Sequence, residues 1–306
     1  SFVFQAMVIA VILVLARHLR DPLPAQPSHR PDTTGAVLSA VGLVLVVMGI
    51  LAADDDLRLM LVLLVLGAAV LAWFFLHVRA RERAGEEPLL SASLFRNRVS
   101  NLGLVTQHVQ WLMLLGTSFV VSAFLQVVRG YGAVQTGVIF TAATAGLLIA
   151  SLLAGRMAKR RSQRTLIIAG FLVTIPGIAL LLVLVGETSS PWAFVPGLFV
   201  IGLGLGTMLT PSVNVVQSAF PEDQQGAISG LSRSVSNLGS SVGTALAGTI
   251  LVAHLVHRNY LAAMVVIGVA GLAGLVAAWM LPRSAAPVVS GTGTASLDTP
   301  TRMDTT

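Results

Sequence analysis

Hydrophobic residues fall in nine long blocks that are separated by short polar stretches. The blocks cover residues 2–16, 35–53, 59–76, 102–128, 133–154, 165–185, 192–217, 228–256 and 260–281. A helix needs about 20 apolar residues to cross the ~30 Å hydrocarbon core of a bilayer, and only the first block falls clearly short of that length. None shows the alternation that is typical of membrane β-strands. The pattern therefore predicts nine transmembrane helices and an all-α integral membrane fold.

Composition supports the membrane class and excludes several classes of function. Of the 306 residues, 55% are hydrophobic and 10% are charged, whereas a soluble domain usually carries about 25% charge. The net charge of +6 comes from short clusters between the blocks, without a basic stripe interleaved with aromatic residues, so no nucleic-acid partner is predicted. The sequence has no cysteine, which excludes thiol catalysis and disulfides. No Ser–His–Asp arrangement or phosphate-binding loop is present either, so we predict neither an enzyme nor a bound cofactor.

The basic residues also predict an orientation. Because successive spans alternate in direction, alternate loops share one side of the membrane. One side collects sixteen Lys and Arg residues, and the other holds only Arg58, Arg129 and Arg258. Cytoplasmic loops carry the excess of positive charge. The split predicts a multi-pass protein of the cell membrane with a cytoplasmic C-terminus and with acidic residues 54–56 outside.

Two central blocks carry polar stripes, each on one face of a helix with about 3.6 residues per turn. Polar groups that face lipid are costly, so such stripes face protein or a water-filled cavity. Hydrogen bonding between packed helices is one explanation. A substrate cavity is the other, and we favour it because two amides, an indole and an asparagine exceed what packing needs. The predicted substrate-facing residues are Gln107, Gln110, Trp111 and Ser118 in block 102–128 and Thr210 and Asn214 in block 192–217.

Small residues predict close helix packing elsewhere. Block 228–256 places Ser232, Ser236 and Gly243 on one face, and the spacing of Gly239 and Gly243 is that of close helix contacts. Gly202 and Gly206 repeat this spacing in block 192–217.

Ionisable groups are nearly absent from the apolar blocks. No Asp or Glu lies inside them, so an acid for proton coupling inside the membrane is missing from these blocks. His254 and His257 have a spacing that permits metal sharing, but no carboxylate accompanies them and no metal site is predicted. We interpret His108 as a hydrogen-bonded polar group and not as a proton relay.

A faint internal repeat leads to a family resemblance. The segments 126–137 and 217–226 each place Gln and Gly before a helix, on opposite sides of the membrane. This pattern is typical of two three-helix units with inverted topology. Four stretches then resemble the fourteen-helix drug:proton antiporter branch of the major facilitator superfamily. They are residues 88–98 with Leu94-Phe-Arg-Asn-Arg98, the helix opening Gln135-Thr-Gly137, the basic run 155–164, and residues 220–226 followed by Asn237, Gly239 and Gly243.

The resemblance implies a domain organisation. The chain would correspond to the last nine of fourteen helices. Residues 1–17 would end an N-terminal bundle, 18–98 would hold linkers and two inserted helices, 99–283 would form a six-helix transport bundle, and 284–306 would be a disordered tail. The N-terminal bundle of the same protein would then be a partner of this chain, together with the lipid bilayer.

The resemblance also implies a function, which is secondary active export of hydrophobic or amphiphilic drugs, cationic ones included, driven by a proton gradient. It implies a gate-loop or structural role for Arg156, Arg160, Arg161, Arg164 and Arg233. Lys159 departs from the family pattern, which places an acid there. Two alternatives remain open from the residues alone: a facilitator or importer of polar solutes, and a non-transporting membrane scaffold subunit.

Overall fold

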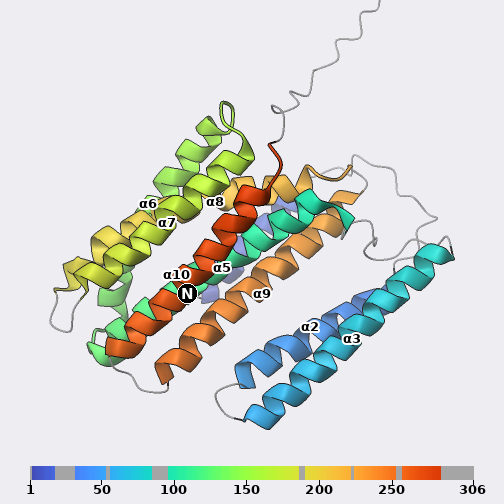
Figure 1. The fold of residues 1–306 in the computed structure, drawn as a ribbon, viewed down its shortest axis with the longest axis horizontal. Helices are drawn as coiled ribbons and strands as arrows, with labels where there is room; N and C mark the ends of the chain where they lie inside the picture. Colours follow the sequence, from blue (N-terminus) through green and yellow to red (C-terminus); the bar gives the residue numbers. More distant parts are fainter. Residues whose placement is uncertain are drawn as a thin grey trace, which may run out of the picture.

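The computed structural model describes residues 2–17, 32–52, 56–84, 96–185, 190–221, 224–252 and 257–283. Within these residues, one α-helix lies at each of the nine predicted positions. The helices are α1 (Phe2–Ala16), α2 (Thr33–Leu51), α3 (Leu57–Arg83), α5 (Arg98–Ala123), α6 (Ala133–Met157), α7 (Gln163–Leu184), α8 (Phe194–Gln217), α9 (Gln225–Val252) and α10 (His257–Met280). A short π-helix, η2 (Phe124–Val128), continues α5, and a 3-10 turn, η3 (Pro191–Ala193), precedes α8. Figure 1 shows the long helices lying side by side along a common direction.

Seven of the described helical segments are long and apolar enough to cross a membrane. This finding confirms the predicted all-α membrane class. The two helices outside this set differ for separate reasons. The helix α1 is short, with only 15 residues. The helix α9 is long enough, with 28 residues, but its serines and other polar side chains lower its mean hydropathy.

Six helices, α5 to α10, pack into a bundle with a recurring pairing. The helix α5 packs along α9 and α10, and α8 packs along α6 and α7. The first helix of each three-helix unit thus contacts the second and third helices of the other unit. In addition, α5 contacts α8 and α7 contacts α10. These main pairings are symmetric, because they stay the same when α5, α6 and α7 are exchanged for α8, α9 and α10, respectively.

Glycines produce the closest approaches in this bundle. A Cβ placed on Gly239 or Gly243 of α9 would collide with the backbone of α5, at the carbonyl groups of His108 and Leu112. On α8, a Cβ at Gly202 or Gly206 would likewise meet the backbone of α6. The close packing predicted from the two glycine pairs is therefore confirmed, and it allows helices to associate without a hydrophobic driving force between them.

An aromatic cluster joins three elements at one end of the bundle. The ring of Phe124 in η2 lies 4.6 Å from the ring of Tyr260 in α10 and 6.1 Å from that of Phe194 in α8, measured between centroids. The guanidinium of Arg129 sits 5.5 Å from the centroid of the Phe124 ring, within cation–π range. All three rings are fully buried, so they hold the ends of α5, α8 and α10 together.

The helices α2 and α3 form a hairpin beside α9 (Figure 1). The helix α2 buries Gly35, Gly42 and Gly49, which lie seven residues apart and therefore on one face. Gly42 and Gly49 face Leu71 and Leu64 of α3. The helix α1 is different, because every side chain described in it is exposed.

Candidate functional site

The amide of Gln107 lies inside the interface between α5 and α9. Its Nε2 donates to Ser236 Oγ at 2.9 Å, and its Oε1 accepts from Ser232 Oγ at 2.8 Å. The side chain is 3% exposed. Both ends of the amide are therefore used by one neighbouring helix, as expected for a buried polar group.

Gln110 makes the equivalent contact with α8. Its Oε1 accepts from Ser212 Oγ at 2.6 Å, and the residue is 1% exposed. The structure differs here from the prediction that Gln107 and Gln110 line a solvated cavity. The physical reason is that serines of α8 and α9 lie opposite the two amides and form hydrogen bonds with them across the helix interfaces. Contact of Gln107 or Gln110 with a substrate stays a prediction.

The other four predicted residues lie on a more open surface. Trp111 and Asn214 are half-buried, and Thr210 is exposed. Their side chains make no hydrogen bond with any residue that the structure describes. Ser118 is half-buried and its Oγ donates to the carbonyl of Leu114, 2.7 Å away. We call Trp111, Ser118, Thr210 and Asn214 the open polar face.

The helix α9 adds further polar groups, and among them the sequence predicted a gate-loop or structural role for Arg233. Arg233 and Asn237 are exposed, although Ser232 and Ser236 beside them are buried against α5. Ser240 is half-buried and donates to the carbonyl of Ser236 at 3.1 Å. Neighbouring residues on a helix point about 100° apart, so α9 presents Ser232 and Ser236 to α5 on one side and the exposed Arg233 and Asn237 on another. The unusual polarity of α9 was the available sequence signal.

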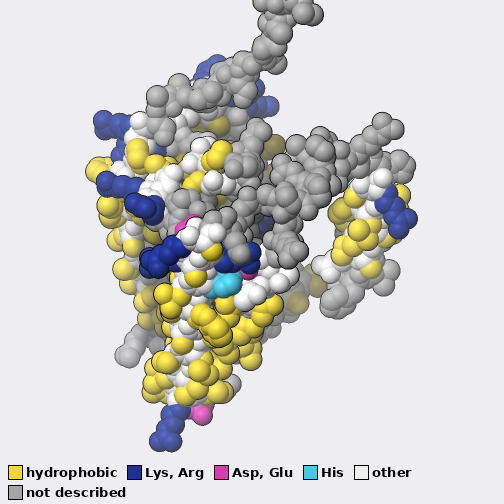
Figure 2. Space-filling model, turned by 90° about the vertical axis from the view of Figure 1, so that its right-hand side faces the viewer, with side chains coloured by type: hydrophobic (Ala, Val, Ile, Leu, Met, Phe, Trp, Pro, Cys, Tyr) yellow, Lys and Arg dark blue, Asp and Glu magenta, His cyan; other side chains and the backbone are white. Residues whose placement is uncertain are grey.

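The predicted gate-loop arginines fall into two groups. Arg156, Arg160 and Arg161 are exposed in and beside the turn between α6 and α7. Arg164 instead donates through its guanidinium to the carbonyl of Trp279 at 2.7 Å, so it ties the start of α7 to the last turn of α10. A positive charge at that end of α10 is also favourable for the helix dipole. Figure 2 shows Lys and Arg gathered toward the upper part of the view, above a surface rich in hydrophobic side chains.

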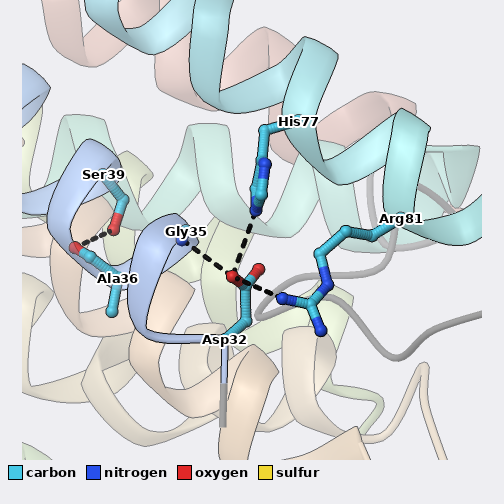
Figure 3. A network of polar contacts seen from close by, with 6 residues as sticks. All are labelled: Asp32, Gly35, Ala36, Ser39, His77 and Arg81. Atoms are coloured by element: carbon cyan, nitrogen blue, oxygen red, sulfur yellow. Dashed lines mark hydrogen bonds and ion pairs between the residues drawn. The ribbon is translucent and has the colours of Figure 1, made fainter.

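A charged network at the hairpin was missed by sequence reasoning (Figure 3). Asp32 precedes α2, and its Oδ1 accepts from the backbone nitrogen of Gly35 at 2.8 Å. The same oxygen lies 3.1 Å from His77 Nε2 and 3.1 Å from an Arg81 guanidinium nitrogen, both on α3. The Asp32 side chain is 1% exposed. An aspartate before a helix signals an N-cap, but nothing in the sequence links it to residues 45 and 49 positions away.

Metal ligands do not gather within the described part of the chain. Over those residues, no group of three or more His, Cys, Asp or Glu side chains is arranged to hold an ion. His254, which the sequence analysis considered with His257, lies outside the described residues, and the side chain of His257 is not described.

The seven candidate membrane spans define a multi-pass α-helical membrane protein. The model of the Major Facilitator Superfamily matches residues 1–244 and, in a second and overlapping match, residues 109–302. The chain belongs to the Major Facilitator Superfamily.

Relatives with described roles agree with this membership. A puromycin resistance protein of Streptomyces alboniger is 30% identical over 296 residues, which cover 89% of this chain and 58% of the relative. A tetracenomycin C resistance and export protein of Streptomyces glaucescens is 29% identical over 246 residues, covering 79% and 43%. A multidrug efflux pump of Mycolicibacterium smegmatis is 27% identical over 263 residues, covering 82% and 49%. The chain thus spans about half the length of the curated relatives it matches.

Proposed function

We propose that this chain forms part of a secondary active transporter that exports hydrophobic or amphiphilic drug-like compounds across the cell membrane. One observation carries the proposal. The indole of Trp111, the amide of Asn214 and the hydroxyl of Thr210 form no hydrogen bond with any described residue of the bundle. Membership in a transporter superfamily and the resistance and export roles in the names of its relatives support it.

The open polar face suits a substrate that is mostly apolar. The indole of Trp111 offers a flat surface on which an aromatic or cationic compound stacks. Asn214 and Thr210 supply hydrogen-bonding groups that orient such a compound. Gln107 and Gln110 act as positioning residues in this proposal, because their bonds to α9 and α8 hold α5 at the angle that presents Trp111.

The proposed mechanism is alternating access. Residues 99–283 form one rocking bundle, and the swapped pairing of α5–α6–α7 with α8–α9–α10 supports an inverted repeat within it. The chain as a whole would provide the last nine helices of a fourteen-helix transporter, with the hairpin α2–α3 as the inserted pair and a second bundle opposite. The proton gradient is the proposed driving force, and the end rich in Lys and Arg is the proposed cytoplasmic side, which includes the C-terminus.

The test is a Trp111→Ala substitution in the full-length protein. Losing a stacking partner worth about 0.5–2 kcal/mol should raise the KM for efflux of an aromatic cationic dye roughly 2- to 30-fold. Abundance in the membrane should stay the same, since the side chain makes no hydrogen bond to described residues. Trp73→Ala is the matched control, because Trp73 is 62% exposed on α3 and lies off the open polar face. Efflux kinetics that are identical in both variants and the parent protein, at equal abundance, would remove Trp111 from the site.

A binding measurement separates transport from a scaffold role. The chain has four tryptophans, so replacing Trp73, Trp192 and Trp279 with Phe leaves Trp111 as the only reporter. We expect transported compounds to quench its fluorescence at saturating concentration. A spectrum that stays constant across a panel of hydrophobic, cationic and polar compounds would support the scaffold alternative and contradict the proposal.

A further inference from the structure

An apolar groove of about 430 Å³ runs between the hairpin α2–α3 and α9. The hairpin contributes Ser39, Leu71 and Phe75 to its walls, and α9 contributes a face that extends from Gly226 through Gly230 to Leu238. No residue of α5 or α8 lines it. The groove is therefore separate from the open polar face, and the inference below does not rest on the proposed function.

The lining of the groove offers a ligand mostly apolar surface. None of its residues is charged. The hydroxyl of Ser39 donates to the carbonyl of Ala36 at 3.0 Å (Figure 3), and that of Ser234 donates to the carbonyl of Gly230 at 3.0 Å. Both hydroxyls are thus satisfied within their own helices. A water molecule needs two to four polar partners, which this lining does not supply.

No side chain that the structure describes fills this space. A Cβ added to Gly226 or Gly230 would meet no described atom within 4 Å, in contrast to Gly239 and Gly243 on the same helix. The volume lies within the ~300–1,000 Å³ range of ligand sites. Two of the three walls, α2 and α3, are by length and composition candidate membrane spans, so the groove would adjoin the hydrocarbon region of a bilayer. An occupant must therefore come from the apolar part of the bilayer.

Charge at one end of the groove points to the kind of occupant. Arg79 and Arg83 follow Phe75 at intervals of four residues along α3, and both are exposed. Neither forms an ion pair with any residue that the structure describes. Arg81 between them is engaged by Asp32. Two guanidinium groups without a described acidic partner complement a molecule with an anionic head and an alkyl tail. Each basic group near a membrane surface favours anionic lipid by about fivefold.

We propose that this groove binds an anionic phospholipid. One acyl chain lies between α2–α3 and α9, against Phe75 and Gly230, and the phosphate lies at Arg79 and Arg83. The lipid fills the space that the glycines leave open and joins the hairpin to the bundle.

The experiment measures lipid selectivity with a tryptophan in the groove. In the full-length protein Phe75 is replaced with Trp, and every native tryptophan, including the four of this chain, is replaced with Phe. It is reconstituted into vesicles of phosphatidylcholine that contain a small fraction of brominated phosphatidylglycerol, or the same fraction of brominated phosphatidylcholine. Val183→Trp in the same background is the matched control, because Val183 is 81% exposed on α7. The groove reporter should show about a 30-fold preference for the anionic quencher, and the control should show little preference.

Two further variants locate the binding determinants. Arg79→Gln together with Arg83→Gln should bring the lipid preference at the groove reporter close to that of the control. Gly230→Leu should abolish it by filling the groove while leaving the protein folded, because the added side chain begins in open space.

Three results would overturn the proposal. The first is equal quenching of the groove and control reporters by both lipids. The second is a preference that survives loss of both arginines. The third is relief of quenching by a transported compound at low concentration, which would make the groove a substrate site. None of these readouts uses Trp111, so the first two results would leave the proposed transport site untouched.

Discussion

The contact between Gln107 and Ser232 yields a quantitative prediction about what holds α5 to α9. Gln107 makes two hydrogen bonds to α9. Interhelical hydrogen bonds in membrane proteins are worth about 0.6 kcal/mol on average, with a maximum of about 1.7 kcal/mol. The two bonds together should therefore stabilise the fold by about 1.2 kcal/mol, and the Gln107–Ser232 bond alone by about half of that.

A double-mutant cycle isolates the second quantity. The variants Gln107→Ala and Ser232→Ala and their combination are made in the full-length protein, and unfolding by sodium dodecyl sulfate in mild detergent is followed by circular dichroism. The double variant should lose less free energy of unfolding than the two single variants together, by about 0.6 kcal/mol. Ser234→Ala provides the control pair, because the Ser234 hydroxyl bonds to its own helix at Gly230 and should be additive with Gln107→Ala.

Additivity of Gln107→Ala with Ser232→Ala, as in the control, would refute the interhelical bond. If substrate KM then also rose in Gln107→Ala without a loss of stability, the amide would belong to the substrate site that the sequence predicts. The cycle thus decides between the two explanations of the polar stripe on α5.

Two other predictions test packing and topology. Gly243→Leu should strongly reduce the yield of folded protein, because its Cβ would meet the backbone of α5 and overpacking costs about 1–3 kcal/mol or more. Gly230→Ala is the control and should leave the yield unchanged, because its Cβ enters open space. Size-exclusion chromatography measures the yield of both variants. Single cysteines at Arg58 and Arg83 in the naturally cysteine-free chain should react with an impermeant maleimide from opposite faces, because the 27-residue α3 rises roughly 40 Å and exceeds the ~30 Å core. Labelling of both positions from the same face would contradict a transmembrane α3.

The positions of the helices could be predicted well from hydrophobic blocks, and their ends less well. The block 59–76 lies inside α3, which continues to Arg83 because charged residues extend a helix beyond the apolar pattern. The helix α9 begins at Gln225, three residues before its apolar block. The π-helix η2 left no sequence signal. Hydrophobicity indicates where a span lies, whereas hydrogen bonding decides where a helix ends.

The sequence indicated which residue types belong to the candidate site, but it did not indicate which side chains would form hydrogen bonds with them. A stripe of polar residues on α5 indicates that the face avoids lipid, and both explanations of that stripe satisfy this condition. Gln107 and Trp111 lie one turn apart, yet one is enclosed by Ser232 and Ser236 and the other is half-open. The distinction depends on the rotation of α9 against α5. Glycine spacing indicated that these helices come close, and it carried no information about which serines would meet the amides.

The aspartate before α2 determines how the hairpin can move. Donors from Gly35, His77 and Arg81 converge on a single carboxylate oxygen of Asp32. Sliding α2 along α3 by even one turn would break the bonds to His77 and Arg81 together and strand a buried negative charge, at a cost on the order of 3 kcal/mol. Any displacement of the pair must therefore move α2 and α3 together as one rigid unit.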